Sequence, residues 1–565
     1  MPSVRRLIPL CWLIPAAMLA LAPMPGAATE TASETYLVRA LAAYKFIMLG
    51  EKHDNPEHHR IQARLLAGLV EAGRRPAVVW EMIARDKQAA IDAFASSGES
   101  DPDRFAEIVG APYAVRDPAE IAPFLIEPRD KFHGRSPLVL RPGSVAEVSA
   151  ILKLADESRT PIVPQGGNTG MVGGQVPSAA GNEIVVSLSR LNRIRAVDPA
   201  TNTLIAEAGV ILADAHAAAD AVDRLFPLSL ASEGSCEIGG NLSTNAGGTG
   251  VLAYGNMREL VLGVEVVLPG GAVWDGLRTL RKDNTGYDLK HLFIGGEGTL
   301  GIVTAAVLKL SPKPRGVGVA FVGLKSPDDA LKLLQIARSQ AGPHLTAFEL
   351  LPRIGLDIVI RHAEGARDPL AASYPWYVLM EYSSGRSQQD ADEAIEGIFA
   401  AGFEDGLVED GAQAQSLEQA KAFWHLRESM SEMQKHEGGS IKHDVAVPLA
   451  AVPELLARGV AAVEKMIPGV RPVPFGHVGD GNIHFNFTQP VDMDKQAFLD
   501  RWEEVNATVH AIVTELGGTI SAEHGIGTLK RDMLKGVKSP LELDLMRRVK
   551  AAFDPNGIMN PGKVL

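Results

Sequence analysis

Three dense glycine-rich segments, at residues 164–174, 233–248 and 295–301, constrain the fold of this chain more than any other feature of its sequence. The first segment comes directly after a short apolar run that is expected to form a strand. Its successive backbone N–H groups therefore lie at a strand end, and such groups bind phosphate oxygens. A single cluster is most often a structural turn. Three in one stretch of chain predict a domain whose loops hold a dinucleotide.

The third segment contains the pattern G-x-G-x-x-G at Gly296, Gly298 and Gly301. In a nicotinamide-binding Rossmann domain this pattern opens a helix, whose N-terminus faces the pyrophosphate. Here it is followed by residues 302–310, whose β-branched side chains predict a strand. We therefore do not expect a Rossmann site.

The apolar runs predict an α+β protein with two main parts. Residues 101–315 combine expected strands at 160–164, 184–188 and 203–208 with a helix that opens at the capping box Ser144–Glu147. From 316 onward a strand–helix rhythm predicts a sheet with helices on one face, such as a ferredoxin-like cap. Its expected strands and helices are 317–324, 326–340, 345–350, 377–382 and 391–402.

Residues 1–28 have the pattern of a secretory signal peptide: Arg5 and Arg6, an apolar run over 7–22, and small residues at 26–28. This predicts export to the periplasm, and an uncleaved membrane anchor is the alternative.

Residues 29–100 contain a fragment and a linker. Strand-like 46–49 precedes a run rich in charged residues and histidine, and the segment resembles the start of the ChaN-like haem-binding proteins, although most of such a domain is missing. Its candidate haem or metal ligands are Glu51, His53, His58, His59 and Glu81. We favour surface polar residues on a truncated fold. An exported haem- or metal-binding protein remains the alternative function of another class.

A candidate metal site lies near the C-terminus. His477 and His484 flank a Gly-Asp-Gly-Asn turn, which can bring both imidazoles to one point, and Glu523-His524 adds a carboxylate and a third imidazole. Two histidines and one carboxylate with an open position form a catalytic metal set.

Basic residues nearby are candidates for binding an anion. Arg427 and Ser431 are spaced to share one face of a helix, and Lys442 follows. The chain carries a formal net charge of −13, so an anionic ligand needs such local cations. The same charge excludes a general nucleic-acid binder.

The glycine segments, together with 283–289, resemble the FAD-linked oxidases of the vanillyl-alcohol-oxidase fold, in the branch of D-2-hydroxyglutarate and D-lactate dehydrogenases. The resemblance covers 104–565. It implies a two-subdomain, PCMH-type FAD-binding domain (101–315), and a C-terminal substrate and metal domain (316–565) with the ferredoxin-like cap and a helical segment. The first loop lacks the histidine that attaches FAD in some relatives, so non-covalent FAD is implied. The implied cofactor contacts are Gly166, Gly167, Asn168, Thr169, Gly170, Gly173, Gly174, Gly234, Ser235, Gly239, Gly240, Asn241, Thr244, Asn245, Gly247, Gly248, Glu297, Gly298, Ile302 and Val303.

The resemblance also assigns the C-terminal residues. His477, His484 and Glu523 match ligands of a divalent metal, usually zinc, and His524 matches the catalytic base. The positions that bind substrate in the family are Arg427, Ser431, Lys442 and Asn486. The family often has threonine at the position of Ser431, and the hydroxyl is retained.

The implied reaction is FAD-dependent, metal-assisted oxidation of a D-2-hydroxy acid, D-2-hydroxyglutarate foremost, to the 2-oxo acid. A D-lactate or glycolate dehydrogenase is the alternative. Expected partners are the 2-hydroxy acid and an electron acceptor (a flavoprotein, a quinone or a cytochrome), with a second copy of the chain as a further candidate. The resemblance implies a cytoplasmic enzyme, whereas the leader predicts export.

Overall fold

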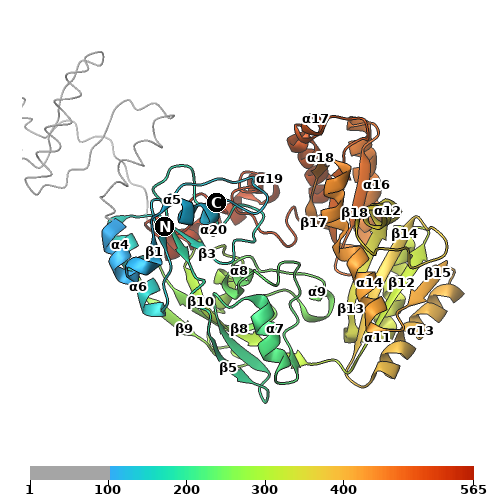
Figure 1. The fold of residues 1–565 in the computed structure, drawn as a ribbon, viewed down its shortest axis with the longest axis horizontal. Coiled ribbons are helices and arrows are strands. Elements are labelled where there is room, and N and C mark those ends of the chain that lie inside the picture. The colour runs from blue at the N-terminus through green and yellow to red at the C-terminus, as the bar shows by residue number, and fades with distance from the viewer. Residues whose placement is uncertain (1–101) are drawn as a thin grey trace, which may run out of the picture. The chain divides into compact units, whose positions relative to one another are not determined.

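A computed structural model describes residues 102–565, which belong to one compact unit spanning Asp92–Leu565 (Figure 1). The predicted signal peptide and the candidate ligands Glu51, His53, His58, His59 and Glu81 lie outside the described residues.

The first sheet carries the first glycine loop. Its order is β1-β2-β4-β3, parallel except at β1. Ser144 caps the helix that covers this sheet by accepting the backbone N–H of Glu147, as predicted. The elements are β1 (Ala114–Val115), β2 (Val139–Leu140), α6 (Val145–Ser158), β3 (Ile162–Gln165) and β4 (Ile184–Ser187).

The second sheet is antiparallel in the order β5-β6-β10-β8-β9. β10 begins directly after Gly301, so the third glycine segment opens a strand, which confirms that it is not a Rossmann motif. The strands and their helices are β5 (Ile194–Asp198), β6 (Thr203–Glu207), α7 (Leu212–Asp220), α8 (Ile238–Ser243), β8 (Val261–Val267), β9 (Val273–Gly276) and β10 (Ile302–Lys309). The short pair β7 (Arg224–Leu225) and β11 (Ser311–Pro312) leads to the next part.

The cap sheet has the antiparallel order β13-β14-β12-β15, the strand order of a ferredoxin-like fold, as predicted. α11 and α13 lie side by side on one face (Figure 1). α12 and α14 cover the second face as well, because alternate residues of the strands are apolar on both faces. The elements are β12 (Gly316–Leu324), α11 (Pro327–Ala341), β13 (Leu345–Pro352), α12 (Arg353–His362), β14 (Trp376–Ser384), α13 (Gln388–Glu404), β15 (Asp410–Gln413) and α14 (Leu417–Glu428).

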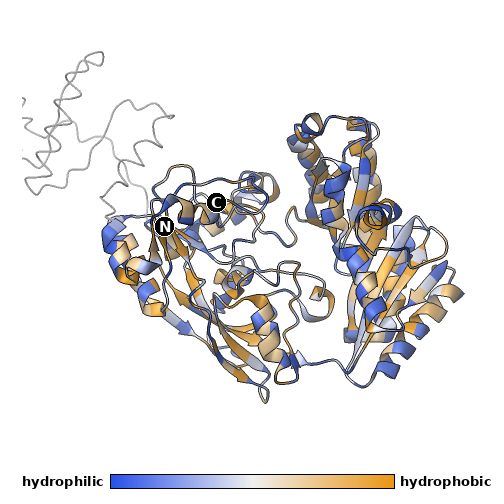
Figure 2. Cartoon of the chain, in the orientation of Figure 1, coloured by the Kyte–Doolittle hydropathy of each residue, from blue (hydrophilic) through white to orange (hydrophobic). Residues whose placement is uncertain are grey.

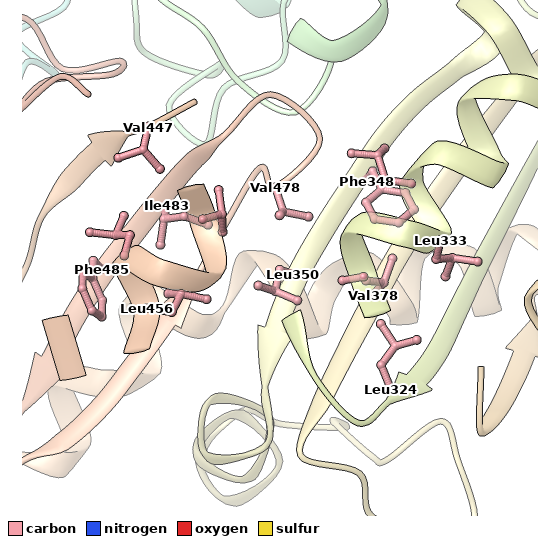
Figure 3. Packing of buried hydrophobic residues seen from close by; sticks show 14 of the residues in the cluster. Leu324, Leu333, Phe348, Leu350, Val378, Val447, Leu456, Val478, Ile483 and Phe485 are labelled. Carbon is pink, nitrogen blue, oxygen red and sulfur yellow. The ribbon is translucent and has the colours of Figure 1, made fainter. Parts of the chain in front are cut away.

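A small fourth sheet carries the candidate metal ligand His484. β19 is its central strand and pairs with the three others. Its buried side chains, among them Ile483 and Phe485, join those of the cap in one continuous apolar core (Figure 3). Figure 2 shows the matching hydropathy, with hydrophobic residues concentrated on the strands and mixed along the outer helices. The elements are β16 (Ser440–Ile441), β17 (Asp444–Ala446), α16 (Val452–Met466), β18 (Arg471–Phe475), β19 (Asn482–Thr488) and α18 (Trp502–Glu515).

The C-terminal segment returns to the first sheet. α20 (Pro540–Phe553) starts at the capping box Ser539–Glu542, and the backbone N–H of Ile162 then donates to the carbonyl of Ile558 at 2.8 Å. No helix in the described part of the chain has the length and apolarity needed to cross a membrane. The remaining short helices are α4 (Pro102–Val109), α5 (Pro118–Ile121), α9 (Val251–Tyr254), α10 (Lys290–Phe293), α15 (Met430–Met433), α17 (Lys495–Leu499) and α19 (Leu534–Val537).

Candidate active site

The predicted cofactor loops line one cleft at the end of β3. The first loop and α8 meet the segment that precedes β10 along it. The predicted residues that line it are Gly166, Gly167, Asn168, Thr169, Gly170, Gly174, Gly239, Gly240, Asn241, Thr244, Glu297, Gly298, Ile302 and Val303. Six others lie outside its lining: Gly173, Gly234, Ser235, Asn245, Gly247 and Gly248. The three loops therefore line one cleft, with these six residues outside its lining.

The cleft fits a polar ligand held by backbone. A Cβ on Gly167 would lie 1.9 Å from the carbonyl oxygen of Ser235, so the two loops approach each other as only glycine permits. Asn168 Oδ1 and Glu237 Oε2 are buried without a hydrogen-bond partner among the described residues. Buried polar atoms are normally paired, so these two are suited to a polar cofactor such as FAD.

FAD should be held without a covalent bond. No histidine lines this cleft in the described part of the chain. We expect acid or heat denaturation of the purified protein to release all of its flavin into the supernatant, measured by absorbance and fluorescence. Flavin that stays on the precipitated chain would contradict this expectation.

The candidate metal ligands meet in one group, in which His477 is buried and His484 and Glu523 are half-buried. His477 lies in the turn between β18 and β19, and His484 lies on β19, with ring centroids 5.3 Å apart. Glu523 Oε1 is 3.5 Å from His477 Nε2, and its Oε2 is 3.9 Å from His484 Nε2. One ligand atom from each of the three residues lies within 4.8 Å of the other two. The donor set therefore fits a divalent metal such as zinc.

Glu349 joins the metal group to the candidate substrate arginine, and the sequence analysis missed it. This carboxylate on β13 is 1% exposed, accepts from Arg427 Nε at 2.7 Å, and lies 2.7 Å from His477 Nδ1. Burial opposes its ionisation, yet the charges of His477 and Arg427 hold the pKa of Glu349 at about 2. The Glu349 carboxylate binds Nδ1 of His477, and Nε2 of the same ring faces Glu523. Metal-binding histidines have this arrangement, with a carboxylate on the ring nitrogen that does not bind the metal.

The two histidines differ in protonation. Burial opposes protonation of His477, but Glu349 raises its pKa to about 9. Burial and the charge of His477 lower the pKa of His484 well below its usual value, so His484 is neutral. Burial, which Asp444 reinforces, raises the pKa of Glu523 to about 7.

Asp444 orients the loop of the predicted base His524. Its buried Oδ2 accepts the backbone N–H groups of Glu523 and His524 at 2.9 and 3.0 Å and lies 3.5 Å from His524 Nδ1. Burial lowers the pKa of His524, so its imidazole is neutral and can accept a proton. The sequence analysis assigned no role to Asp444.

The substrate-binding candidates differ from the prediction in one respect. Arg427 and Ser431 were expected on one helix, but α14 ends at Glu428 and Ser431 lies on α15. Each has its own partner: Arg427 binds Glu349, whereas Ser431 Oγ accepts from Lys442 Nζ at 2.8 Å. Among residues 102–565, the two Nη groups of Arg427 have no hydrogen-bond partner, although the guanidinium carbon lies 4.8 Å from the centroid of the Phe475 ring, so these N–H groups can donate to a ligand.

Asn486 lies two residues beyond His484 on β19 and is 1% exposed. Its Nδ2 donates to Gln434 Oε1 at 2.8 Å, so one of its two amide N–H groups already has an acceptor.

The cofactor loops and the metal group are adjacent. A Cβ on Gly247 would lie 3.5 Å from Glu523 Oε1. The carboxylate of Glu297 accepts the backbone N–H groups of Ile526 and Gly527, each at 2.7 Å. Glu297 thus ties the third glycine segment to the loop of His524. The predicted cofactor loops and the candidate metal ligands therefore lie next to each other.

Three families of known proteins match the chain. The FAD linked oxidases, C-terminal domain, match residues 313–564, and the FAD binding domain family matches 136–276. The family described as haem-binding uptake, Tiki superfamily, ChaN matches 37–114, which confirms the predicted N-terminal resemblance. The described end of that last match packs Phe105 and Val109 into the core of the first sheet.

The mitochondrial D-2-hydroxyglutarate dehydrogenase of Arabidopsis thaliana is 39% identical over 474 residues, which cover 84% of this chain and 82% of the relative. The D-2-hydroxyglutarate–pyruvate transhydrogenase of Saccharomyces cerevisiae is 37% identical over 79% of this chain and 90% of its own. Among solved structures, p-cresol methylhydroxylase superposes with a TM-score of 0.65 at 16% identity over 86% of this chain and 98% of that one. That likeness shows the fold alone and confirms the predicted FAD-binding architecture.

Proposed function

The chain belongs to the FAD-linked oxidase family, and we propose that this FAD-dependent oxidoreductase oxidises D-2-hydroxyglutarate to the 2-oxo acid. One observation carries the proposal: the buried Glu349 joins Arg427, a cation with free Nη groups, to His477 of the metal group beside the cofactor loops. An anionic hydroxy acid bound there has its carboxylate and its hydroxyl held by different groups of one rigid network.

Arg427 serves the carboxylate that all 2-hydroxy acids share. Its charge adds to the burial that lowers the pKa of His484 and opposes the burial that raises the pKa of Glu523, so it acts close to the candidate metal ligands. Glu349 fixes the guanidinium through Nε and leaves the Nη groups for a charge-assisted hydrogen bond.

Lys442 and Ser431 serve the distal carboxylate of the dicarboxylic acid. None of the charged neighbours that act on the Lys442 pKa is a candidate metal ligand. Burial lowers that pKa to about 8, reinforced by Lys435, Arg129 and Lys131 and opposed by Glu432. At neutral pH the ammonium is therefore charged and partly desolvated.

His524 removes the hydroxyl proton. Its neutral imidazole has Nδ1 on the side of Asp444, which leaves Nε2 for the substrate. When bound, FAD supplies the hydride acceptor, and a divalent ion held by His477, His484 and Glu523 supplies positive charge beside the substrate oxygen. The product is the 2-oxo acid, and the electrons leave to an external acceptor.

The direct test is turnover of D-2-hydroxyglutarate, L-2-hydroxyglutarate, D-lactate and glycolate with an artificial acceptor. We expect the highest kcat/KM for D-2-hydroxyglutarate. A preference for D-lactate would move the assignment to a monocarboxylate dehydrogenase and leave the flavin and metal roles intact.

Lys442→Met should show which carboxylate of the substrate Lys442 binds. A charge-assisted hydrogen bond contributes about 1.5–3 kcal/mol, so kcat/KM for D-2-hydroxyglutarate should fall roughly ten- to hundredfold and that for D-lactate little. Arg427→Lys, which retains a charge opposite Glu349, should lower kcat/KM for both acids. The control is Lys435→Met, whose ammonium is exposed. Equal losses on both acids in Lys442→Met would contradict the distal role.

A further inference from the structure

Glu237 lies in the second glycine segment, directly before α8, and its side chain is 6% exposed. It lines the cofactor cleft opposite the first loop, where a Cβ on Gly166 would lie 3.3 Å from its Oε2. That oxygen is buried and has no hydrogen-bond partner among the described residues. Nothing in the fold or in the proposed reaction uses this carboxyl.

An ionised carboxylate in this position is unfavourable, because no hydrogen bond replaces those that the group would make to water. Arg141, next to β2, is the one charged group that acts on it, and no hydrogen bond joins the two in the described structure. Burial, opposed by Arg141, raises the pKa of Glu237 to about 8. At neutral pH the group is a carboxylic acid with an O–H to donate.

We propose that Glu237 is a cofactor-binding residue that holds FAD as a neutral carboxylic acid, donating its O–H to a cofactor oxygen, and that loss of this proton releases the flavin. The inference rests on FAD binding in this cleft. The pyrophosphate of FAD is anionic, so an ionised Glu237 would repel the cofactor and leave its acceptor unpaired. Affinity is therefore linked to protonation of one side chain.

The sign of the pH effect follows from this linkage. The acid form binds FAD, so affinity is constant below the pKa of the free protein and falls as pH rises through it. Well above that value the dissociation constant should rise about tenfold per pH unit, roughly thirtyfold between pH 7 and pH 9.5. FAD binding should likewise take up about half a proton per flavin near pH 8 and close to one above about pH 9.

The experiment measures free flavin fluorescence after dilution and ultrafiltration of the full-length holoprotein across this pH range. Parent protein should lose FAD as pH rises. Glu237→Gln, which keeps shape and a donor but cannot ionise, should bind FAD about as tightly as the parent at pH 7 and stay flat. Glu233→Gln is the matched control, because it lies in the same loop with its side chain 52% exposed; it should behave as the parent.

Proton uptake provides a second readout that needs no variant. FAD added to flavin-depleted parent protein in weak buffer near pH 8.5 should raise the pH of the solution. A parent affinity that does not change with pH, a Glu237→Gln curve that falls with the parent's, or binding without proton uptake would each overturn the proposal. Parent protein that binds no FAD at pH 7 would instead overturn the cofactor assignment itself.

Discussion

Replacing His524 with glutamine should lower kcat for D-2-hydroxyglutarate by about a hundred- to ten-thousandfold, the range that a positioned general base contributes. Glutamine cannot take the hydroxyl proton, although it can occupy much of the same space. FAD and metal contents should stay at the parent's values, because the Glu523 and His524 backbone N–H groups still bind Asp444.

The measurement is steady-state turnover with an artificial acceptor, together with flavin and metal content per chain. His425→Gln is the control, since His425 is an exposed histidine on α14. If His524→Gln keeps more than about a tenth of the parent's kcat, another group removes the proton and the role assigned to His524 is wrong.

His477→Ala should remove the bound metal and reduce turnover at least about a hundredfold while leaving FAD bound. Loss of one of three protein ligands opens the site, and it also leaves Glu349 with Arg427 as its single cationic partner. The cofactor cleft is built by other segments, so flavin should remain.

The readout is metal content by elemental analysis beside the flavin absorbance, with Glu523→Ala as a second variant that removes a different ligand. Both variants should lose metal. Full activity in protein depleted of metal would show that His477, His484 and Glu523 are structural.

Much of the fold could be predicted because its elements are local patterns. The apolar runs at 317–324 and 345–350 became β12 and β13, and the capping residues Ser144 and Ser539 begin α6 and α20 as expected. His477 and His484 could be paired from the sequence for the same reason: one short turn connects the strands next to them.

Contacts between distant segments could not be predicted in the same way. Glu349 precedes His477 by 128 positions and reaches it only because β13 lies beside β18. The available signal was a lone charged residue in an apolar strand, which must have a buried partner. Glu237 gave a similar signal, a carboxyl inside a glycine-rich loop. No sequence signal indicates that the helix ends between Arg427 and Ser431, since neither glycine nor proline lies between them.

The central claim is that a D-2-hydroxy dicarboxylate reduces FAD bound to this chain, and anaerobic stopped-flow spectroscopy tests it most directly. Mixing the oxidised holoprotein with D-2-hydroxyglutarate should bleach the flavin absorbance in a rapid, saturable phase, while L-2-hydroxyglutarate should leave it unchanged. A holoprotein that carries FAD and the full metal complement yet shows no bleaching with D-2-hydroxyglutarate would contradict the account.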